Sequence, residues 1–312
     1  MDYYNMSVSF DPFEKKTDIS ASSRKLYTFN LRKLNEGKEI KNLNFLSKPV
    51  IEEKLETLTP NTRRTYIIAV VSSLKDRPEA KYKKLYNKFY KMLVDINADL
   101  KTNTTKSEKQ KQNWITQEEV MKKCKDLGEI TEEIKGKRKI SEEQYTQLYH
   151  AVVLGLYCLQ PPRRNSDYTK MLVVKNVPED TDYNYLDMKN WEWIFNNYKT
   201  QKTYKQVKLP VPEELVKLLK VYFQYHPEAK KLKKKTFVPV PFLMTQEGKV
   251  IDTSTEMTRT LNKIFGKKIG SSLLRNIFLT DKYSDNAKEM EDDVKAMGTS
   301  SNTATHNYIK TD

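Results

Sequence analysis

The sequence predicts a mainly α-helical protein of two domains with one small antiparallel β-sheet. Its 312 residues, with 38% hydrophobic content, are enough for two ordinary cores. Glycine is scarce, at 8 residues, and most apolar residues recur at the steps of three and four that are typical of helices. The alternation typical of strands stands out in residues 183–212, which are rich in aromatic and β-branched residues and include a lysine-rich turn.

After an N-terminal tail (1–20), residues 21–100 are expected to form a compact helical domain. Its first helix should begin after Ser22 or Ser23, with Leu26, Phe29 and Leu34 on one face. The second and third helices are each indicated by a capping residue close before a proline. These pairs are Ser47 with Pro49 and Thr59 with Pro60. The fourth helix, at 80–100, places five apolar residues on one face: Tyr82, Leu85, Phe89, Leu93 and Ile96.

Residues 101–113 lack apolar periodicity and carry several lysines, so we expect a flexible basic linker there. The second domain (114–312) should contain a long apolar helix that begins at a capping box of Ser141 and Gln144. Further helices are expected at 116–127, 212–225, 254–265, 271–283 and 285–297, and a short terminal helix should hold the sequence THNY.

The chain is strongly basic, because 56 Lys and Arg residues against 41 Asp and Glu give a formal net charge of +15. The excess is spread along most of the chain, which favours a polyanionic partner such as nucleic acid. A ribosomal or membrane-surface protein would have a similar balance. The motifs must therefore decide the class.

The two cysteines, Cys124 and Cys158, are far apart in sequence and have no Cys or His nearby at metal-ligand spacing. We therefore expect no disulfide framework, no bound metal and a reducing compartment. No apolar run approaches membrane-spanning length, and the polar start is unlike a secretory or mitochondrial leader. These features predict a soluble, intracellular protein without a membrane partner.

The most specific string is MGTSSNTATHNYIK at 297–310, in which a Met-Gly turn precedes two serines and a tyrosine ten positions after the glycine. It resembles the nucleophile box of the tyrosine recombinase (phage integrase) family, and Gly298, Ser300, Ser301 and Tyr308 match that box. The resemblance implies that the phenol of Tyr308 attacks a phosphodiester and forms a 3′-phosphotyrosine link. Such a link conserves the bond energy, so resealing needs neither ATP nor metal, and no cofactor is expected. A buried tyrosine on a terminal helix is the structural alternative.

Two arginine boxes of the family also have counterparts. In PPRRNSDY, Arg164 and Asp167 have the Arg-x-x-acid spacing of the first box, and in SSLLRNIFLT, Arg275 occupies the arginine of the His-x-x-Arg motif. A guanidinium donates two hydrogen bonds to phosphate and stays charged, so the resemblance implies that both arginines stabilise the transition state. Asp167 is expected to support the site. Arg163 is expected to end the preceding helix, favoured by the helix dipole.

The family also places a general-acid lysine on a β-hairpin, where it protonates the departing 5′ oxygen. The turn YKTQKTYKQVKLP offers Lys199, Lys202 and Lys205. We assign this role to Lys199, because the Lys-Thr pair after the aromatic strand resembles the family pattern, although counting back from Pro210 would favour Lys202. The other lysines are expected to bind DNA phosphates or to solvate the hairpin.

The sequence departs from the family at two positions. Ser272 stands where the His-x-x-Arg motif has histidine, and Thr299 stands where the nucleophile box has His or Trp. Both hydroxyls can donate a hydrogen bond to phosphate, but neither can accept the tyrosine proton as an imidazole would. His306 is two residues from Tyr308 and should face away from it on a helix. Cleavage is therefore expected to be slower or differently assisted.

The resemblance covers both domains in outline: 21–100 is similar to the SAM-like core-binding domain and 114–312 to the catalytic domain. The segment 59–75 is similar to the family's helix that lies in DNA, although a solvated face would have the same pattern. Candidate phosphate contacts outside the hairpin are Arg63, Arg64, Lys75, Lys109 and Lys111, with a nonspecific patch of lysines at 230–235.

Together these motifs predict a site-specific recombinase or integrase that binds double-stranded DNA, and the resemblance implies a homotetramer on DNA. A type IB topoisomerase or a telomere resolvase would use the same chemistry. A DNA-binding module whose active site has decayed would be compatible with Ser272 and Thr299. The target sequence and the host or mobile element stay open.

Overall fold

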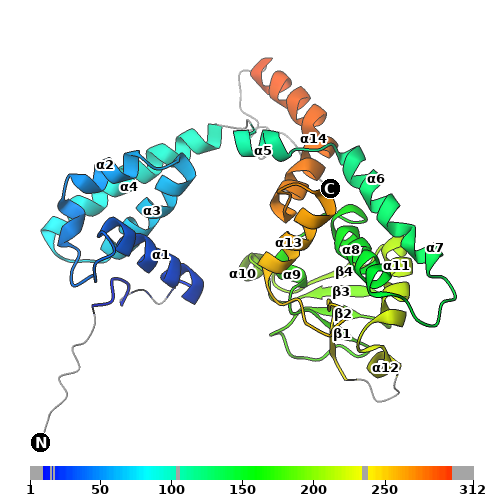
Figure 1. The fold of residues 1–312 in the computed structure, drawn as a ribbon. Coiled ribbons are helices and arrows are strands. Elements are labelled where there is room, and N and C mark those ends of the chain that lie inside the picture. Colours follow the sequence, from blue (N-terminus) through cyan, green and yellow to red (C-terminus); the bar gives the residue numbers. More distant parts are fainter. Residues whose placement is uncertain (1–9, 15, 17, 103–105, 234–237, 297–312) are drawn as a thin grey trace, which may run out of the picture. The chain divides into compact units, whose positions relative to one another are not determined.

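The computed structural model describes residues 10–14, 16, 18–102, 106–233 and 238–296 (Figure 1). The chain divides into two compact units, 1–105 and 106–312, and the boundary lies within the predicted linker. The described part is mainly helical, and each unit has its own hydrophobic core.

The amino-terminal unit contains helices α1 (Ala21–Leu34), η1 (Asn44–Ser47), α2 (Val50–Glu56), α3 (Pro60–Leu74) and α4 (Ala80–Thr102). As predicted, α3 follows Thr59 and has Pro60 in its first turn. The predicted apolar face of α4 is also confirmed, since Tyr82 and Phe89 are buried in the core. The second helix starts later than predicted, because Ser47 is the last residue of the 3₁₀ helix η1 and α2 begins at Val50.

The predicted buried face of the first helix is wrong in part. Leu34 is buried, but Leu26 and Phe29 are 47% and 55% exposed. The buried residues of this helix are Asn30, Leu31 and Leu34. Two apolar stripes with helical spacing lie on this short segment, and packing against α3 selects the second of them.

The expectation of a flexible linker at 101–113 is wrong for its second half. Residues Glu108–Asn113 form helix α5, which begins at a capping box of Ser107 and Gln110. The side-chain oxygen of Asn113 accepts a hydrogen bond from the backbone N–H of Lys268 at 2.9 Å, so α5 is attached to the carboxy-terminal unit.

The carboxy-terminal unit contains nine further described helices: α6 (Gln117–Gly128), α7 (Ile130–Glu133), α8 (Glu142–Cys158), α9 (Asn165–Tyr168), α10 (Gln201–Tyr204), α11 (Glu213–Tyr225), α12 (Ala229–Leu232), α13 (Ser254–Phe265) and α14 (Ser271–Ala296). The predicted capping box of Ser141 and Gln144 starts α8, which is mostly buried and packs against α6, α11 and α13. The two helices predicted after residue 271 form one continuous helix, α14.

The sheet has five strands in the order β4-β3-β2-β1-β5. The strands are β1 (Leu172–Val174), β2 (Tyr185–Asp187), β3 (Glu192–Phe195), β4 (Val207–Pro210) and β5 (Val240–Pro241). The antiparallel pairing predicted within 183–212 is confirmed, but the whole sheet is mixed, because β1 pairs with β2 in parallel. The lysine-rich turn between β3 and β4 contains α10, which the sequence did not predict. Figure 1 shows the sheet beneath α8 and α11.

The expectation of two unpaired cysteines is wrong. Cys124 of α6 and Cys158 at the end of α8 form a disulfide, with an S–S distance of 2.10 Å and a Cα–Cα distance of 6.7 Å. The packing of α6 on α8 brings them together across 34 residues of sequence, which spacing alone could not reveal. In the described part of the chain, no helix is both long and apolar enough to cross a membrane.

Candidate active site

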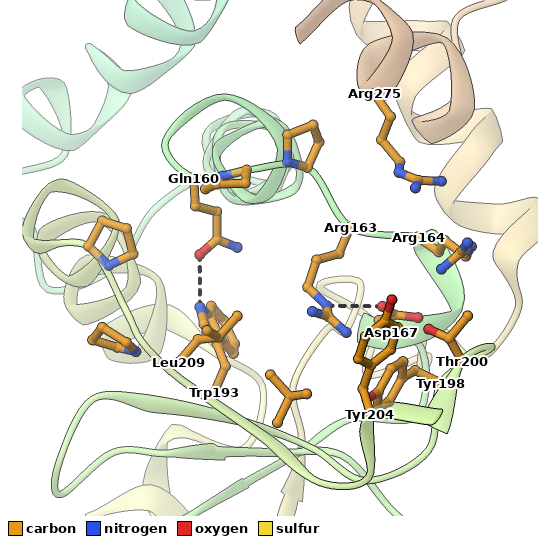
Figure 2. Close-up of a pocket in the computed structure, with 15 residues that line it drawn as sticks. Gln160, Arg163, Arg164, Asp167, Trp193, Tyr198, Thr200, Tyr204, Leu209 and Arg275 are labelled. Atoms are coloured by element: carbon orange, nitrogen blue, oxygen red, sulfur yellow. Dashed lines mark hydrogen bonds and ion pairs between the residues drawn. The ribbon is translucent and has the colours of Figure 1, made fainter. Parts of the chain in front are cut away.

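A cavity of about 600 Å³ opens where three segments of the carboxy-terminal unit meet: the α8–α9 connection, the β3–β4 hairpin and the first turns of α14 (Figure 2). Its lining residues are Gln160, Pro161, Pro162, Arg163, Arg164, Asp167, Trp193, Tyr198, Thr200, Tyr204, Val207, Leu209, Pro210, Pro212 and Arg275. Three of the predicted catalytic residues, Arg164, Asp167 and Arg275, therefore line one cavity.

The cavity carries an excess of positive charge. Arg164 and Arg275 are half-buried, and neither forms an ion pair with a carboxylate in the described part of the chain. Asp167 is the one carboxylate among the described lining residues, and Arg163 already binds it. Figure 2 shows the guanidinium groups of Arg164 and Arg275 on the same side of the cavity. Two guanidinium groups without a counterion in a concave site favour an anion with several oxygen atoms, such as a phosphate.

Arg163 has a different environment from its neighbour. Its Nε donates a hydrogen bond to Oδ2 of Asp167 at 3.0 Å, and its guanidinium carbon lies 3.8 Å from the ring centroid of Phe195. The expectation that Arg163 ends a helix is wrong, because α8 already ends at Cys158. The sequence motif pairs the acid with Arg164 by spacing, whereas the structure pairs it with Arg163.

Asp167 is held inside the protein with its side chain 2% exposed. Burial raises the pKa of its carboxyl group, and the charge of Arg163 partly opposes this effect. Its Oδ1 also accepts a hydrogen bond from the hydroxyl of Ser166. Asp167 thus holds the guanidinium group of Arg163, and its predicted supporting role at the site stays a prediction.

Buried Asn165 fixes the backbone directly after Arg164. Its Oδ1 accepts a hydrogen bond from the hydroxyl of Tyr157 at 2.6 Å, and its Nδ2 donates to Oγ1 of Thr258 and to the carbonyl of Ser254. These partners belong to α8 and α13. The position of Arg164 is thus determined by contacts to the two helices that pack together in the core.

A second set of hydrogen bonds fixes the start of the α8–α9 connection over the sheet. Gln160 accepts a hydrogen bond from Nε1 of Trp193 at 2.9 Å and donates one to the hydroxyl of Tyr168 at 2.7 Å. Trp193 and Tyr168 are both fully buried. No sequence motif marks this glutamine, since its role depends on Trp193, which is distant along the chain.

The three hairpin lysines are exposed, and none of them is among the residues that line the cavity. Lys199 lies between Tyr198 and Thr200, which both line the cavity, although Lys199 itself is not among the lining residues. Lys202 lies in α10. Lys205 follows it with a backbone φ of 56°, and its carbonyl accepts a hydrogen bond from the hydroxyl of Tyr198 at 2.8 Å.

The remaining predicted catalytic residues are only partly covered by the structure. Ser272 is exposed in the first turn of α14, three residues before Arg275, and does not line the cavity. Thr299 and Tyr308 lie outside the described residues, as does the predicted terminal helix. Their relation to the cavity therefore stays a prediction.

Some of the candidate phosphate contacts outside the hairpin already bind other groups of the protein, and others are exposed. Arg63 donates to the carbonyl of Glu56, and Arg64 donates to Oδ1 of Asn97, so both are used in packing within the amino-terminal unit. Lys75 and Lys109 are exposed. Among the other lysines, Lys111 forms an ion pair with Glu108 at 2.7 Å and Lys231 with Glu228 at 2.8 Å, while Lys234 and Lys235 lie outside the described residues.

Within the ranges that the structure describes, no group of three or more His, Cys, Asp or Glu side chains is placed to hold a metal ion. The chain matches no protein-family model, no curated protein and no solved structure. Functional inference therefore depends on the sequence motifs and on the geometry of this cavity.

Proposed function

We propose that this protein is a site-specific DNA recombinase that cuts and rejoins double-stranded DNA through a 3′-phosphotyrosine intermediate. The observation that carries the proposal is the meeting of Arg164 and Arg275 in one cavity, since these residues were selected from two separate motifs in distant parts of the sequence. A cavity in which two guanidinium groups have no carboxylate partner among the described residues suits the charge that develops on a phosphate during attack.

In the proposed reaction, the phenol oxygen of Tyr308 attacks the phosphorus of the scissile phosphodiester and its proton passes to solvent. The bond from phosphorus to the 5′ oxygen breaks, and Lys199 donates a proton to that oxygen. Arg164 and Arg275 bind the non-bridging oxygens, and Ser272 and Thr299 each offer a hydroxyl donor. Rejoining is the reverse reaction, with the 5′ hydroxyl as the nucleophile, and four copies of the chain on DNA would complete two exchanges.

The proposal is tested with a pool of nicked duplexes of varied sequence, in which cleavage next to the nick releases a short fragment and traps the enzyme on DNA. We expect an SDS-resistant protein–DNA adduct that forms in excess EDTA, because the arginines and lysine supply the charge stabilisation. Tyr308→Phe should bind DNA but form no adduct. Cleavage that requires Mg²⁺ and leaves no adduct would contradict the proposal.

Further outcomes separate the neighbouring functions. DNA binding that falls steeply with salt, without an adduct from the wild-type chain, would indicate a DNA-binding module with a decayed site. An adduct accompanied by relaxation of supercoiled DNA, without exchange between two sites, would indicate a topoisomerase. Hairpin products from a single duplex would indicate a resolvase.

A further inference from the structure

Asn184, which directly precedes β2, is a polar residue deep inside the carboxy-terminal unit. It is 4% exposed and belongs to none of the motifs that resemble the tyrosine recombinase family. A buried amide is costly to keep unless its hydrogen bonds are satisfied. The partners of Asn184 therefore show what it is for.

All four hydrogen-bonding positions of the Asn184 amide are used. Its Nδ2 donates to the carbonyl of Asp167 at 2.8 Å and to the carbonyl of Asn197 at 2.9 Å. Its Oδ1 accepts from the backbone N–H of Asn196 at 2.8 Å and of Asn197 at 2.7 Å. An amide has two donor hydrogens and two acceptor lone pairs, so no other side chain of this size satisfies the same four groups.

These bonds join the two segments that carry different parts of the proposed chemistry. Asp167 belongs to α9, the short helix that begins directly after Arg164. The carboxylate of Asp167 binds Arg163. Asn197 is two residues before Lys199, at the point where the chain leaves β3 for the lysine-rich turn. The main chain of Asn184 is itself fixed, because its carbonyl accepts a hydrogen bond from the N–H of Leu172 in β1.

We propose that Asn184 is a positioning residue that holds the Lys199 turn at a fixed place relative to the arginine-bearing segment, so that the general acid reaches the leaving oxygen of the phosphate bound there. The proposal rests on the proposed function. It also supports Lys199 over Lys202, because Lys199 is the lysine nearest in sequence to the anchored residues 196 and 197.

The proposal makes the effect of Asn184 specific to the proton donated to the leaving group. Replacing the bridging 5′ oxygen at the scissile position with sulfur removes the need for that proton. A thiol has a pKa of about 8.5 and leaves as the anion, whereas an alcohol is a far weaker acid and needs a proton as it leaves. A variant that has lost only general-acid alignment should therefore cleave the sulfur substrate well.

The experiment uses the full chain and oxygen and sulfur substrates with the cleavage sequence recovered from trapped adducts. We expect Asn184→Asp, which removes both donors in the same volume, to reduce cleavage of the oxygen substrate about 100-fold or more and to cleave the sulfur substrate within about tenfold of wild type. Lys199→Ala should give the same pattern. Asn184→Ser, which keeps one donor and one acceptor, provides a milder variant in case the first folds poorly.

Asn165→Asp is the matched control, because Asn165 is an equally buried amide next to Arg164 but has no bond to the lysine turn. Its cleavage should fall equally on both substrates. An equal fall of both substrates in the Asn184 variants, or no fall at all, would overturn the proposal. Absence of any adduct from the wild-type chain would instead overturn the proposed recombinase function.

Discussion

The adjacent arginines Arg163 and Arg164 should respond to substitution in opposite ways. In Arg163→Ala, the carboxylate of Asp167, whose side chain is 2% exposed in the wild-type fold, would lose its ion-pair partner. Breaking a buried pair in this way costs about 3–5 kcal/mol. The raised pKa of Asp167 lets it take up a proton, which lowers the cost, whereas the lost contact with the Phe195 ring adds about 1 kcal/mol. We therefore expect a loss of about 3 kcal/mol in the free energy of unfolding.

Arg164→Ala should leave the free energy of unfolding within about 0.5 kcal/mol, because the Arg164 side chain has no described ion-pair partner. Its covalent adduct formation should fall about 100-fold or more, as expected when one charge-stabilising donor is removed from a phosphate site. Urea unfolding measured by circular dichroism and adduct formation on a nicked duplex give the two quantities.

A double-mutant cycle supplies the control. Asp167→Asn in the Arg163→Ala background should recover part of the lost stability, because no charge then remains buried without a partner. The assignment of roles would be refuted if Arg164→Ala unfolded the protein to the same extent as Arg163→Ala, or if Arg163→Ala kept full stability.

Three further predictions concern stability. Burial lowers the pKa of His226 to about 4, so the unfolded chain takes up the proton at a higher pH than the folded chain does. The free energy of unfolding should therefore fall by at most about 3 kcal/mol between pH 6.5 and pH 4. His226→Phe should remove this part of the pH dependence in urea titrations. Reduction of the Cys124–Cys158 disulfide, which spans 34 residues, should cost about 3–4 kcal/mol, whereas the Cys124→Ser/Cys158→Ser variant should be insensitive to dithiothreitol. Lys205 has a φ of 56°, a backbone conformation that favours glycine. Lys205→Gly should therefore raise the melting temperature by relieving up to about 1 kcal/mol of strain, whereas Lys205→Ala should not raise it.

Features that depend on a few neighbouring residues could be predicted from the sequence. The capping box at Ser141 and the Thr59-Pro60 pair each mark a helix start through local hydrogen bonds and backbone restriction, and both starts occur as predicted. The buried face of α1 was predicted wrongly because Leu26 and Phe29 share the helical spacing of Leu31 and Leu34. Tertiary packing alone decides between such stripes.

Features that depend on contacts across long stretches of sequence gave no usable signal. Strands β1 and β5 have three and two residues, too few to show alternation, so the parallel pairing of β1 with β2 could not be predicted. The disulfide was missed because Cys124 and Cys158 meet only through the packing of α6 on α8. At the site, the motifs identified Arg164 and Arg275, but the bonds of Asn184 to Asp167 and Asn197 became visible only in the folded chain.

The different contacts of Arg163 and Arg164 begin with the sequence PPRR at 161–164. Pro161 and Pro162 cannot continue α8, because proline has no backbone N–H and disfavours a helical residue before it. At Arg164 the backbone has polyproline II dihedrals, with φ of −76° and ψ of 149°, so Arg164 stands outside any helix. Both arginines line the cavity, but only Arg163 contacts Asp167 and Phe195. Arg164 has no ion-pair partner among the described residues, so its guanidinium group is the one that is left to bind an anion.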